Sequence, residues 1–472
     1  MKRWLAVFAA GLAALMGSVA LAQTAAPVAQ VVKGPDERFQ ADILVVVAHP
    51  DDEGGVTPYL ARAIYDEHKR VAVVYTTRGG SGGNDYTREH GAALGVIREQ
   101  EARQACAKLG ITNVWFLDGK DTASQNVLNS LANWGHGANL EALVRIVRLT
   151  RPEVIISWLP GIFIGENHGD HQASGVLATE AFDLAGEPAT FPAQVAGASK
   201  RLEIYAENLT PWRAKKLYFF SDAEDQKQFA GTGPAYSIKE ISPSQKKPYW
   251  RLAMDAATPH LTQFPEDIHR ISALSDEQIA KMMDDPEHSW WTEPMTLILG
   301  RSLLSTKATD DVFAHTEVSV DFDTQGHFPV STSESHKLEM RLGGPWGFYQ
   351  EFRKPHWLGD LRAAKTPEIA IKAGSTLLVP MLVEHSPASG EDIVQIKVAV
   401  PQGWRVESGS GALKLPHEKL TELRVEILTP ALSAEELKTA RPQEVIVGAE
   451  MRGKPIGEAR LRVLLKANAL PQ

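Results

Sequence analysis

The stretch Asp42-Ile-Leu-Val-Val-Val-Ala48 runs directly into the polar turn His49-Pro-Asp-Asp-Glu53, and this junction decides the fold. A continuous β-branched run is typical of a strand that is buried on both faces, as in a parallel sheet. The acidic turn marks the carboxyl end of that strand. Because open parallel sheets bind ligands outside the carboxyl ends of their strands, this turn is the first candidate site.

Strand and helix patterns alternate after this stretch. The sequence predicts further strands over residues 70–76, 113–117 and 153–158. It predicts helices over residues 57–68, 88–109, 140–150 and 172–184. This alternation indicates an α/β fold with a Rossmann-like, doubly wound, mostly parallel sheet. We expect this unit to span residues 41–220.

The regular alternation ends near residue 220. Residues 221–359 are polar and uneven in pattern, and we expect an irregular extension or cap there. Over residues 366–469, short stretches of alternating hydrophobicity are separated by turn residues, for example Val394-Gln-Ile-Lys-Val-Ala-Val400. This pattern predicts a C-terminal antiparallel β-sandwich.

The N-terminus has the features of a secretory signal peptide. Met1-Lys-Arg3 is positively charged, Leu5 to Ala20 is an apolar run, and Ala20-Leu-Ala22 offers a small-residue cleavage site. We expect cleavage after residue 22, a linker over residues 23–40, and a secreted or periplasmic protein without stable membrane insertion. An uncleaved membrane anchor is the competing interpretation.

Composition narrows the remaining possibilities. The 472 residues are too many for one compact core. A net charge of -9 gives no electrostatic reason to expect a nucleic-acid partner. Cys106 is the only cysteine, so we expect no internal disulfide and a buried helical thiol. Any metal site must therefore use histidine and carboxylate ligands. The oligomeric state is not predicted.

A second polar motif, His168-Gly-Asp-His171, follows the fourth predicted strand. Zn²⁺ accepts imidazole and carboxylate ligands, and a catalytic zinc site has three protein ligands and one open position for water. Two histidines and one aspartate meet this need. The spacing leaves open whether Asp51 or Asp52 is the ligand, because His49 with Asp52 fits a helical turn and His49 with Asp51 fits an extended chain.

The side chains left over suit amide hydrolysis. A carboxylate beside metal-bound water can act as a general base, because the metal lowers the pKa of that water. A spare histidine can stabilise an oxyanion or protonate a leaving amine. No Gly-x-Gly-x-x-Gly follows the first strand and the acidic turn would repel a pyrophosphate, which argues against a dinucleotide-binding protein.

The two motifs in this strand context resemble the LmbE/PIG-L family of zinc-dependent N-acetylglucosaminyl deacetylases. The resemblance covers residues 42–220, which is less than half of the chain. It implies that His49, Asp52 and His171 bind zinc. It also implies that Asp51 is the general base that activates water.

The resemblance assigns roles to further residues. It implies that His168 stabilises the tetrahedral intermediate or acts as an acid, and that Asp170 orients it. Arg98 matches a family Arg-x-x-Glu pattern in which the arginine contacts the sugar; a surface ion pair is the alternative. The segment Thr77-Arg-Gly-Gly-Ser-Gly-Gly83 matches a substrate loop, with a flexible connector as the alternative. For Glu53 we expect a cap at a helix start.

We therefore expect an exported zinc hydrolase of linear amide bonds. It would remove an N-acyl group, acetyl in particular, from an amino sugar or glycoconjugate, so its partner is a small molecule or a glycan. Trp158 is predicted to be a core aromatic side chain at the rim of the sheet. The alternative function is a catalytically idle deacetylase fold that binds glycans through the C-terminal sandwich.

Overall fold

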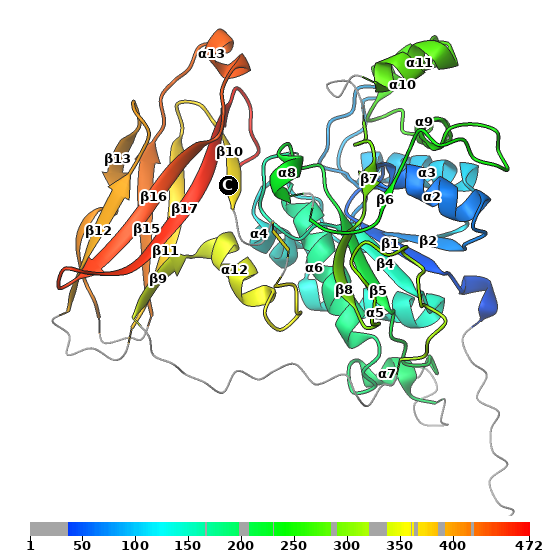
Figure 1. The fold of residues 1–472 in the computed structure, drawn as a ribbon, viewed down its shortest axis with the longest axis horizontal. Helices are drawn as coiled ribbons and strands as arrows, with labels where there is room; N and C mark the ends of the chain where they lie inside the picture. The colour runs from blue at the N-terminus through cyan, green and yellow to red at the C-terminus, as the bar shows by residue number, and fades with distance from the viewer. Residues whose placement is uncertain are drawn as a thin grey trace, which may run out of the picture.

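The computed structural model describes residues 36–165, 168–197, 207–229, 231–284, 290–320, 338–359, 361–362, 367–385, 392–416 and 420–472. The predicted signal peptide over residues 1–22 and most of the predicted linker lie outside the described residues. Figure 1 shows an α/β unit on one side of the molecule and the C-terminal strands on the other, with helix α12 between them.

The α/β unit is built on a six-stranded sheet with the order β3-β2-β1-β4-β5-β8. Its strands are β1 (Ile43–Val47), β2 (Val71–Tyr75), β3 (Asn113–Phe116), β4 (Val154–Trp158), β5 (Lys216–Phe220) and β8 (Ile298–Ser302). The first five are parallel, and β8 runs antiparallel to β5 at the edge. The prediction of an α/β fold with a mostly parallel sheet is confirmed.

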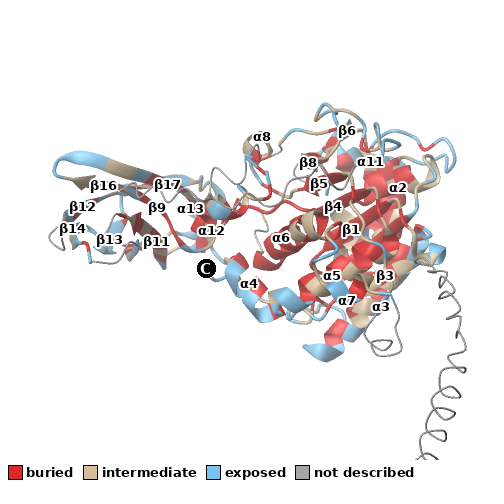
Figure 2. Cartoon of the chain, turned by 90° about the horizontal axis from the view of Figure 1, so that it is seen from below, coloured by how far each residue is buried: buried red, intermediate tan, exposed pale blue. Residues whose placement is uncertain are grey.

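Helices cover both faces of this sheet. Leu44 and Val46 of β1 lie in one hydrophobic cluster with α4, α5 and α6, whereas Val45 and Val47 lie in a second cluster with α2 and α3. The helices are α2 (Thr57–Tyr65), α3 (Ala92–Lys108), α4 (Val127–Trp134), α5 (His136–Thr150) and α6 (Gly169–Leu184). Figure 2 shows the buried residues concentrated in β1, β4 and α6. The alternation of β1 side chains explains why its whole sequence is apolar.

The region after residue 220 is more regular than the predicted irregular extension. It contains α8 (Gln226–Phe229), β6 (Ala235–Tyr236), α9 (Tyr249–Ala257), α10 (Pro265–Ser272), α11 (Asp276–Met283), β7 (Met295–Thr296), β9 (Glu339–Leu342) and α12 (Gly344–Phe352). Helix α9 packs on α2 and α3, and β8 completes the central sheet. The expectation of an irregular segment is therefore corrected. Two short helices, α7 (Pro192–Val195) and α13 (Ala434–Lys438), lie elsewhere.

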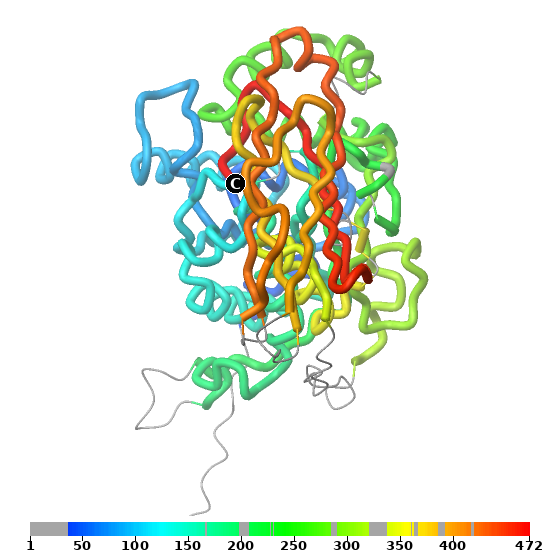
Figure 3. Tube along the Cα trace, turned by 90° about the vertical axis from the view of Figure 1, so that its left-hand side faces the viewer, coloured from blue at the N-terminus to red at the C-terminus, as the bar shows by residue number. Residues whose placement is uncertain are grey.

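The C-terminal part contains two further sheets, with the orders β10-β17-β16-β12-β14 and β13-β15-β11-β9. Their strands are β10 (Glu368–Lys372), β11 (Thr376–Glu384), β12 (Ile393–Ala399), β13 (Arg405–Ser408), β14 (Gly411–Lys414), β15 (Leu420–Leu428), β16 (Gln443–Met451) and β17 (Lys454–Lys466). Figure 3 shows these strands in front of the α/β unit. The prediction of antiparallel strands holds for most pairs, but β10 pairs in parallel with β17, and β9 comes from before residue 366.

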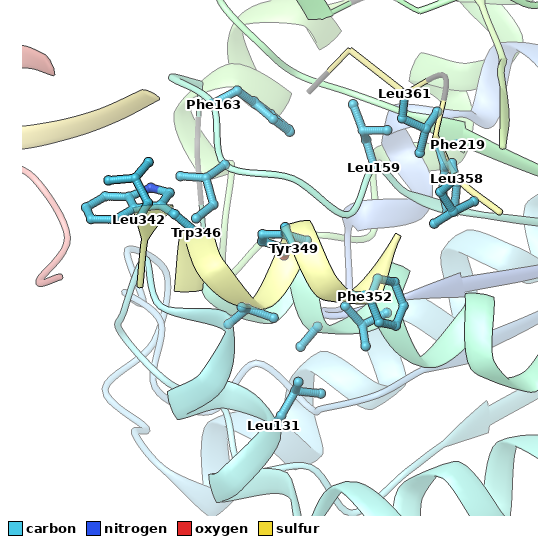
Figure 4. Packing of buried hydrophobic residues seen from close by; sticks show 14 of the residues in the cluster. Leu131, Leu159, Phe163, Phe219, Leu342, Trp346, Tyr349, Phe352, Leu358 and Leu361 are labelled. Carbon is cyan, nitrogen blue, oxygen red and sulfur yellow. The ribbon is translucent and has the colours of Figure 1, made fainter. Parts of the chain in front are cut away.

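Helix α12 joins the two parts. Its residues Trp346, Tyr349 and Phe352 belong to the same buried cluster as Leu159 and Phe163, which follow β4 (Figure 4). The loop after β4 leads to the second polar motif, so the C-terminal part packs close to the candidate site. Within the described ranges, every helix is too short or too polar to cross a lipid bilayer.

Candidate functional site

Three of the predicted site residues converge at the carboxyl ends of β1 and β4. Asp52 Oδ1 lies 3.0 Å from His171 Nε2 and 3.6 Å from His49 Nδ1, and the two histidine nitrogens are 3.2 Å apart. Ligand atoms about 2.0–2.2 Å from one tetrahedral zinc ion lie about 3.3–3.6 Å from one another. The three atoms therefore have the separations of ligands that share one ion.

The turn after β1 fixes the Asp52 carboxylate. Its Oδ2 atom accepts hydrogen bonds from the backbone N–H groups of Ala48 at 2.8 Å and His49 at 2.9 Å, and from Trp158 Nε1 at 2.8 Å. Three donors satisfy this oxygen, which leaves Oδ1 facing the histidines. The short 3-10 helix η2 (Asp52–Gly55) begins at Asp52 and folds the carboxylate back onto the end of the strand.

The second ring nitrogen of His49, Nε2, lies close to two carboxylates. His49 Nε2 lies 3.2 Å from Asp121 Oδ1 and 3.3 Å from Asp170 Oδ2. Asp170 is fully buried and accepts hydrogen bonds from Thr122 N at 2.9 Å and Thr122 Oγ1 at 2.6 Å. The resemblance implied that Asp170 orients His168, but its hydrogen bonds go to Thr122 and His49.

The donor set fits a cation. Burial alone would lower the pKa of His49, but Asp52, Asp121 and Asp170 outweigh burial and raise it well above its ordinary value. Burial would raise the pKa of Asp52, yet His171 and His49 hold it well below its usual range. Three carboxylates thus face a buried imidazole, and buried charges in proteins are paired or bind metals.

Asp51 has a strained backbone next to this cluster, with φ of 109° and ψ of -25°. A non-glycine residue in such a conformation persists only when its surroundings hold it there. Glu53 Oε2 accepts the Asp51 N–H at 3.0 Å, and Glu53 Oε1 lies 2.7 Å from His260 Nε2. Glu53 thus stands at a helix start as expected, and it also binds a histidine from the region after residue 220.

His168 lies beside the ligand cluster. Its ring centroid is 4.8 Å from that of His49 and 5.4 Å from that of His171. The His168 Nδ1 atom is buried without a hydrogen-bond partner. Burial, together with the charges of His49 and His171, lowers the pKa of His168 to about 4. Burial, the largest of these causes, favours the neutral form of the His168 imidazole.

Trp158 belongs to the site and not only to the core. Its ring stacks on His171 with centroids 4.3 Å apart and planes at 9°, while its indole N–H donates to Asp52. The prediction of a core aromatic is correct for burial, since the residue is 6% exposed. The sequence did not show that this side chain orients two candidate ligands at once.

Arg98 is 5% exposed, so the alternative of a surface ion pair is wrong. Its guanidinium donates to Gly79 O at 2.7 Å and Gly83 O at 2.6 Å, and Nε donates to Thr262 Oγ1 at 3.3 Å. A Cβ atom on Gly82 would overlap the guanidinium. The Gly-rich loop is therefore shaped around Arg98, and the predicted contact of Arg98 with substrate stays a prediction.

Sequence reasoning missed two residues that border the predicted set, Asp121 and His260, and assigned Trp158 to the core alone. Asp121 follows β3 at the same rim as the two motifs, and Ser81 N donates to its Oδ2 at 2.7 Å. An acidic residue after a parallel strand was the available signal. His260 gave no signal, because its contact with Glu53 joins positions 207 residues apart.

Residues 44–182 match the family model described as PIG-L: GlcNAc-PI de-N-acetylase. The chain is 33% identical over 188 residues to 1D-myo-inositol 2-acetamido-2-deoxy-alpha-D-glucopyranoside deacetylase 1 of Frankia alni, which covers 36% of this chain and 59% of that relative. It is 26% identical over 255 residues to the corresponding deacetylase of Thermobifida fusca, which covers 47% of this chain and 82% of that relative. The chain thus spans about three fifths of the first relative's length.

Two solved structures resemble the chain in part. A conserved protein from Thermus thermophilus, TT1542, is 21% identical, with a TM-score of 0.38 over 57% of this chain and 98% of that one. N,N'-diacetylchitobiose deacetylase from Pyrococcus horikoshii, complexed with its inhibitor MPG, is 18% identical, with a TM-score of 0.37 over 56% of this chain and 85% of that one.

Proposed function

We propose that this chain is a zinc-dependent hydrolase that removes an N-acyl group, acetyl in the simplest case, from an amino sugar or glycoconjugate; the match of residues 44–182 to the PIG-L family model supports the proposal. The observation that carries the proposal is the convergence of His49 Nδ1, Asp52 Oδ1 and His171 Nε2 within 3.6 Å of one another, next to Asp51. The deacetylase names of the Frankia alni and Thermobifida fusca relatives support the choice of an acetamido sugar.

His49, Asp52 and His171 would hold the zinc ion. Two imidazoles and one carboxylate are ligands that zinc accepts, and three protein ligands leave a position open. When bound, zinc supplies a Lewis acid that polarises the amide carbonyl and lowers the pKa of water. The three N–H groups on Asp52 Oδ2 would restrict this carboxylate to one ligand oxygen, Oδ1.

Asp51 would accept the proton of the attacking water. It is adjacent to the ligand Asp52 and less buried, and Glu53 holds its backbone in place. The oxygen of that water forms a bond to the acyl carbon, the C–N bond breaks, and the amine nitrogen gains a proton. The products are a carboxylic acid and a free amino sugar.

His168 would stabilise the negative charge on the acyl oxygen. Burial lowers the pKa of His168 and so favours the neutral imidazole, which can donate an N–H hydrogen bond but holds no extra proton to give. This property favours the oxyanion role over the acid role. Asp170 and Thr122 would orient His49, and Arg98 would act on the substrate by shaping the Gly-rich loop.

The chain carries a complete set of candidate ligands and a candidate base. A protein that used this fold only to present the C-terminal sheets to glycans would not need all of them. The set therefore favours catalysis over the binding-only alternative. The region after residue 220 would also serve catalysis, because His260 holds Glu53.

We further propose that the protein is exported through a cleavable signal peptide over residues 1–22, on the strength of its charged start and apolar run. We propose in addition that the two C-terminal sheets pack as a β-sandwich. Support comes from Val379 and Val425 of one sheet and Val447 and Val463 of the other, which are buried in the same hydrophobic cluster.

Metal analysis together with an assay of acetate release tests the proposed function. The purified protein should contain stoichiometric zinc and should release acetate from at least one N-acetylated amino sugar. A chelator should stop the release, and added zinc should restore it. Hydrolysis by zinc-free protein would contradict the proposed mechanism.

A further inference from the structure

An apolar cavity of about 310 Å³ lies between the turn after β1, helix α3 and the segment around α9 and α10. Its walls include Ala105, Leu109 and Ile111 from α3 and the residues after it, and Ala256 from α9. Trp290 and Trp291 also line it, together with the polar residues Glu53, Asp222, His260 and Asp267. An apolar cavity of ~150 Å³ is large enough to bind benzene, so this one has room for a chain of roughly ten carbon atoms.

One end of the cavity reaches the candidate reaction centre. Asp51 and Asp52 both contribute to its lining. His168, which would face the acyl oxygen, is not among the described residues that line it. The candidate ligands His49 and His171 are not among them either, so the cavity borders the centre at Asp51 and Asp52 only.

Partly exposed aromatic side chains form another part of the lining. Phe264 and Trp290 are 39% and 37% exposed, and their ring centroids lie 6.3 Å apart. The apolar wall on α3, which lies in the same cavity as Asp51 and Asp52, fits a linear alkyl chain with a polar head. A sugar would find hydrogen-bond partners at Glu53, His260 and Asp267 but none on the wall formed by Ala105, Leu109 and Ile111.

We propose that this cavity binds the acyl chain of the substrate, so that the enzyme hydrolyses medium-length linear N-acyl groups in preference to acetyl. This inference rests on the proposed function and specifies its substrate class. The acyl chain is attached to the carbon that water attacks, so a cavity bordered by Asp51 and Asp52 lies where the chain would leave the reacting carbon. The reaction stays amide hydrolysis: it yields a fatty acid and a free amino sugar.

The test compares kcat/KM for N-acetyl-, N-butanoyl-, N-hexanoyl- and N-octanoyl-glucosamine. Each buried methylene group should raise kcat/KM by up to about fourfold until the cavity is full. Octyl N-acetylglucosaminide carries an alkyl chain of similar length on the glycosidic oxygen instead of the acyl group. Its kcat/KM should equal that of methyl N-acetylglucosaminide. A gain for the octyl glycoside instead would assign the cavity to the aglycone and overturn the proposal.

Two matched variants on α3 distinguish an effect of filling the cavity from a general effect on the helix. Ala105→Leu fills the cavity wall, whereas Ala107→Leu makes the same change at an exposed position of the same helix. Ala105→Leu should lower kcat/KM for the octanoyl substrate by more than about tenfold and leave the acetyl substrate unchanged. Ala107→Leu should change neither. If Ala105→Leu does not fold, Ala257→Leu narrows the same cavity from α9.

Binding of octanoate provides a readout that needs no turnover. Octanoate should change the fluorescence of Trp290 and Trp291 in the wild-type protein, acetate should not, and Ala105→Leu should abolish the octanoate response. Normal acetyl hydrolysis with no dependence on chain length and no octanoate binding would overturn the inference and leave the proposed function intact. Octanoate binding in a protein that hydrolyses no amide would contradict the proposed function and still support an alkyl-chain site.

Discussion

At the residue scale, Asp52 and Trp158 show how one aspartate can be held for metal binding. The Trp158 indole N–H donates to Asp52 Oδ2 while its ring stacks on His171, so one side chain restrains two of the three candidate ligands. Groups that orient metal ligands in this way affect metal affinity without touching the metal.

Trp158→Phe should therefore weaken zinc binding about 10- to 100-fold, because the ring stays and the N–H donor is lost. The affinity can be measured by competition with a chromophoric chelator. Trp212→Phe is the matched control, since its indole N–H donates to Pro152 O at the opposite end of β4. Equal zinc affinity in Trp158→Phe and the wild type would show that the hydrogen bond to Asp52 does not matter.

The sequence predicted the residues of the two motifs because each lies directly after a strand. It could not identify the partners of these residues. Asp170 was expected to orient His168, but a buried carboxylate takes the nearest donors, and in the folded chain these are on Thr122 and His49. Such contacts depend on how loops from different strands meet, which spacing along the chain does not encode.

At the scale of elements, the segment between α9 and α10 and the later residue Trp291 hold the turn after β1 in place. His260 binds the Glu53 carboxylate, Gln263 Nε2 donates to Pro50 O at 2.6 Å, and Trp291 Nε1 donates to Gly54 O at 2.7 Å. These contacts hold the strained conformation of Asp51. The region that looked like an irregular extension therefore supports the candidate base.

His260→Ala should lower kcat about 10- to 100-fold with zinc content unchanged, because Asp51 would lose its fixed position. Steady-state kinetics and metal analysis check this result. The control is His356→Ala, since His356 is also buried and its Nδ1 atom lies 2.7 Å from a carboxylate oxygen of Asp183. A similar fall in kcat in both variants would mean that the effect is one of general stability.

Helices α5 and α6 are joined by a pH-dependent contact. His136 Nε2 lies 2.6 Å from Glu180 Oε2, and this hydrogen bond raises the pKa of His136. Because the pKa of His136 is higher in the folded than in the unfolded protein, protonation of His136 stabilises the fold. This stabilisation is complete below the pKa of about 6.5 in the unfolded chain, and it is lost as the pH rises through the pKa in the folded protein.

His136→Ala should therefore reduce the free energy of unfolding more at about pH 5.5 than at about pH 8.5. The effect should stay below about 1 kcal/mol because the pair is partly exposed. Urea unfolding at both pH values measures it. An equal loss of unfolding free energy at the two pH values would contradict the presence of a charged pair.

Four of the five parallel strands and most of their helices were predicted, because their residues are apolar on both faces of the sheet. Strand β5 and helix α4 were missed, and so were strands β8 and β9. β8 reads Ile298-Leu-Gly-Arg-Ser302 and lies at a sheet edge with most side chains half-buried, and β9 is only four residues long. Short edge strands carry little pattern of their own, and their pairing is determined by the strands that they join.

At the scale of the whole molecule, the C-terminal sheets are fastened to the α/β unit by a buried charge. Glu368 of β10 is 1% exposed; one oxygen lies 2.5 Å from Arg462 Nη1 and the other accepts the Ile164 N–H at 3.1 Å. Ile164 stands in the loop between β4 and the His168 motif. The C-terminal part therefore supports the loop that leads to His168.

Glu368→Gln should lower the free energy of unfolding by about 1–3 kcal/mol, less than the ~3–5 kcal/mol of a fully buried pair because Arg462 is 28% exposed. Chemical denaturation measures the change. Glu444→Gln is the control, since the Glu444–Arg460 pair is exposed on both sides and should contribute less than about 1 kcal/mol. An equal loss of unfolding free energy in the two variants would show that the Glu368–Arg462 pair contributes no more than an exposed pair.

The most direct test of the central claim measures zinc content and amide hydrolysis in Asp51→Asn and His171→Ala side by side. Asp51→Asn should keep stoichiometric zinc and lose about 100- to 10,000-fold in kcat, because it removes the base and leaves the ligands. His171→Ala should lose both zinc and activity, because it removes a ligand. Full activity in Asp51→Asn, or full zinc occupancy in His171→Ala, would contradict the assignment of base and ligand.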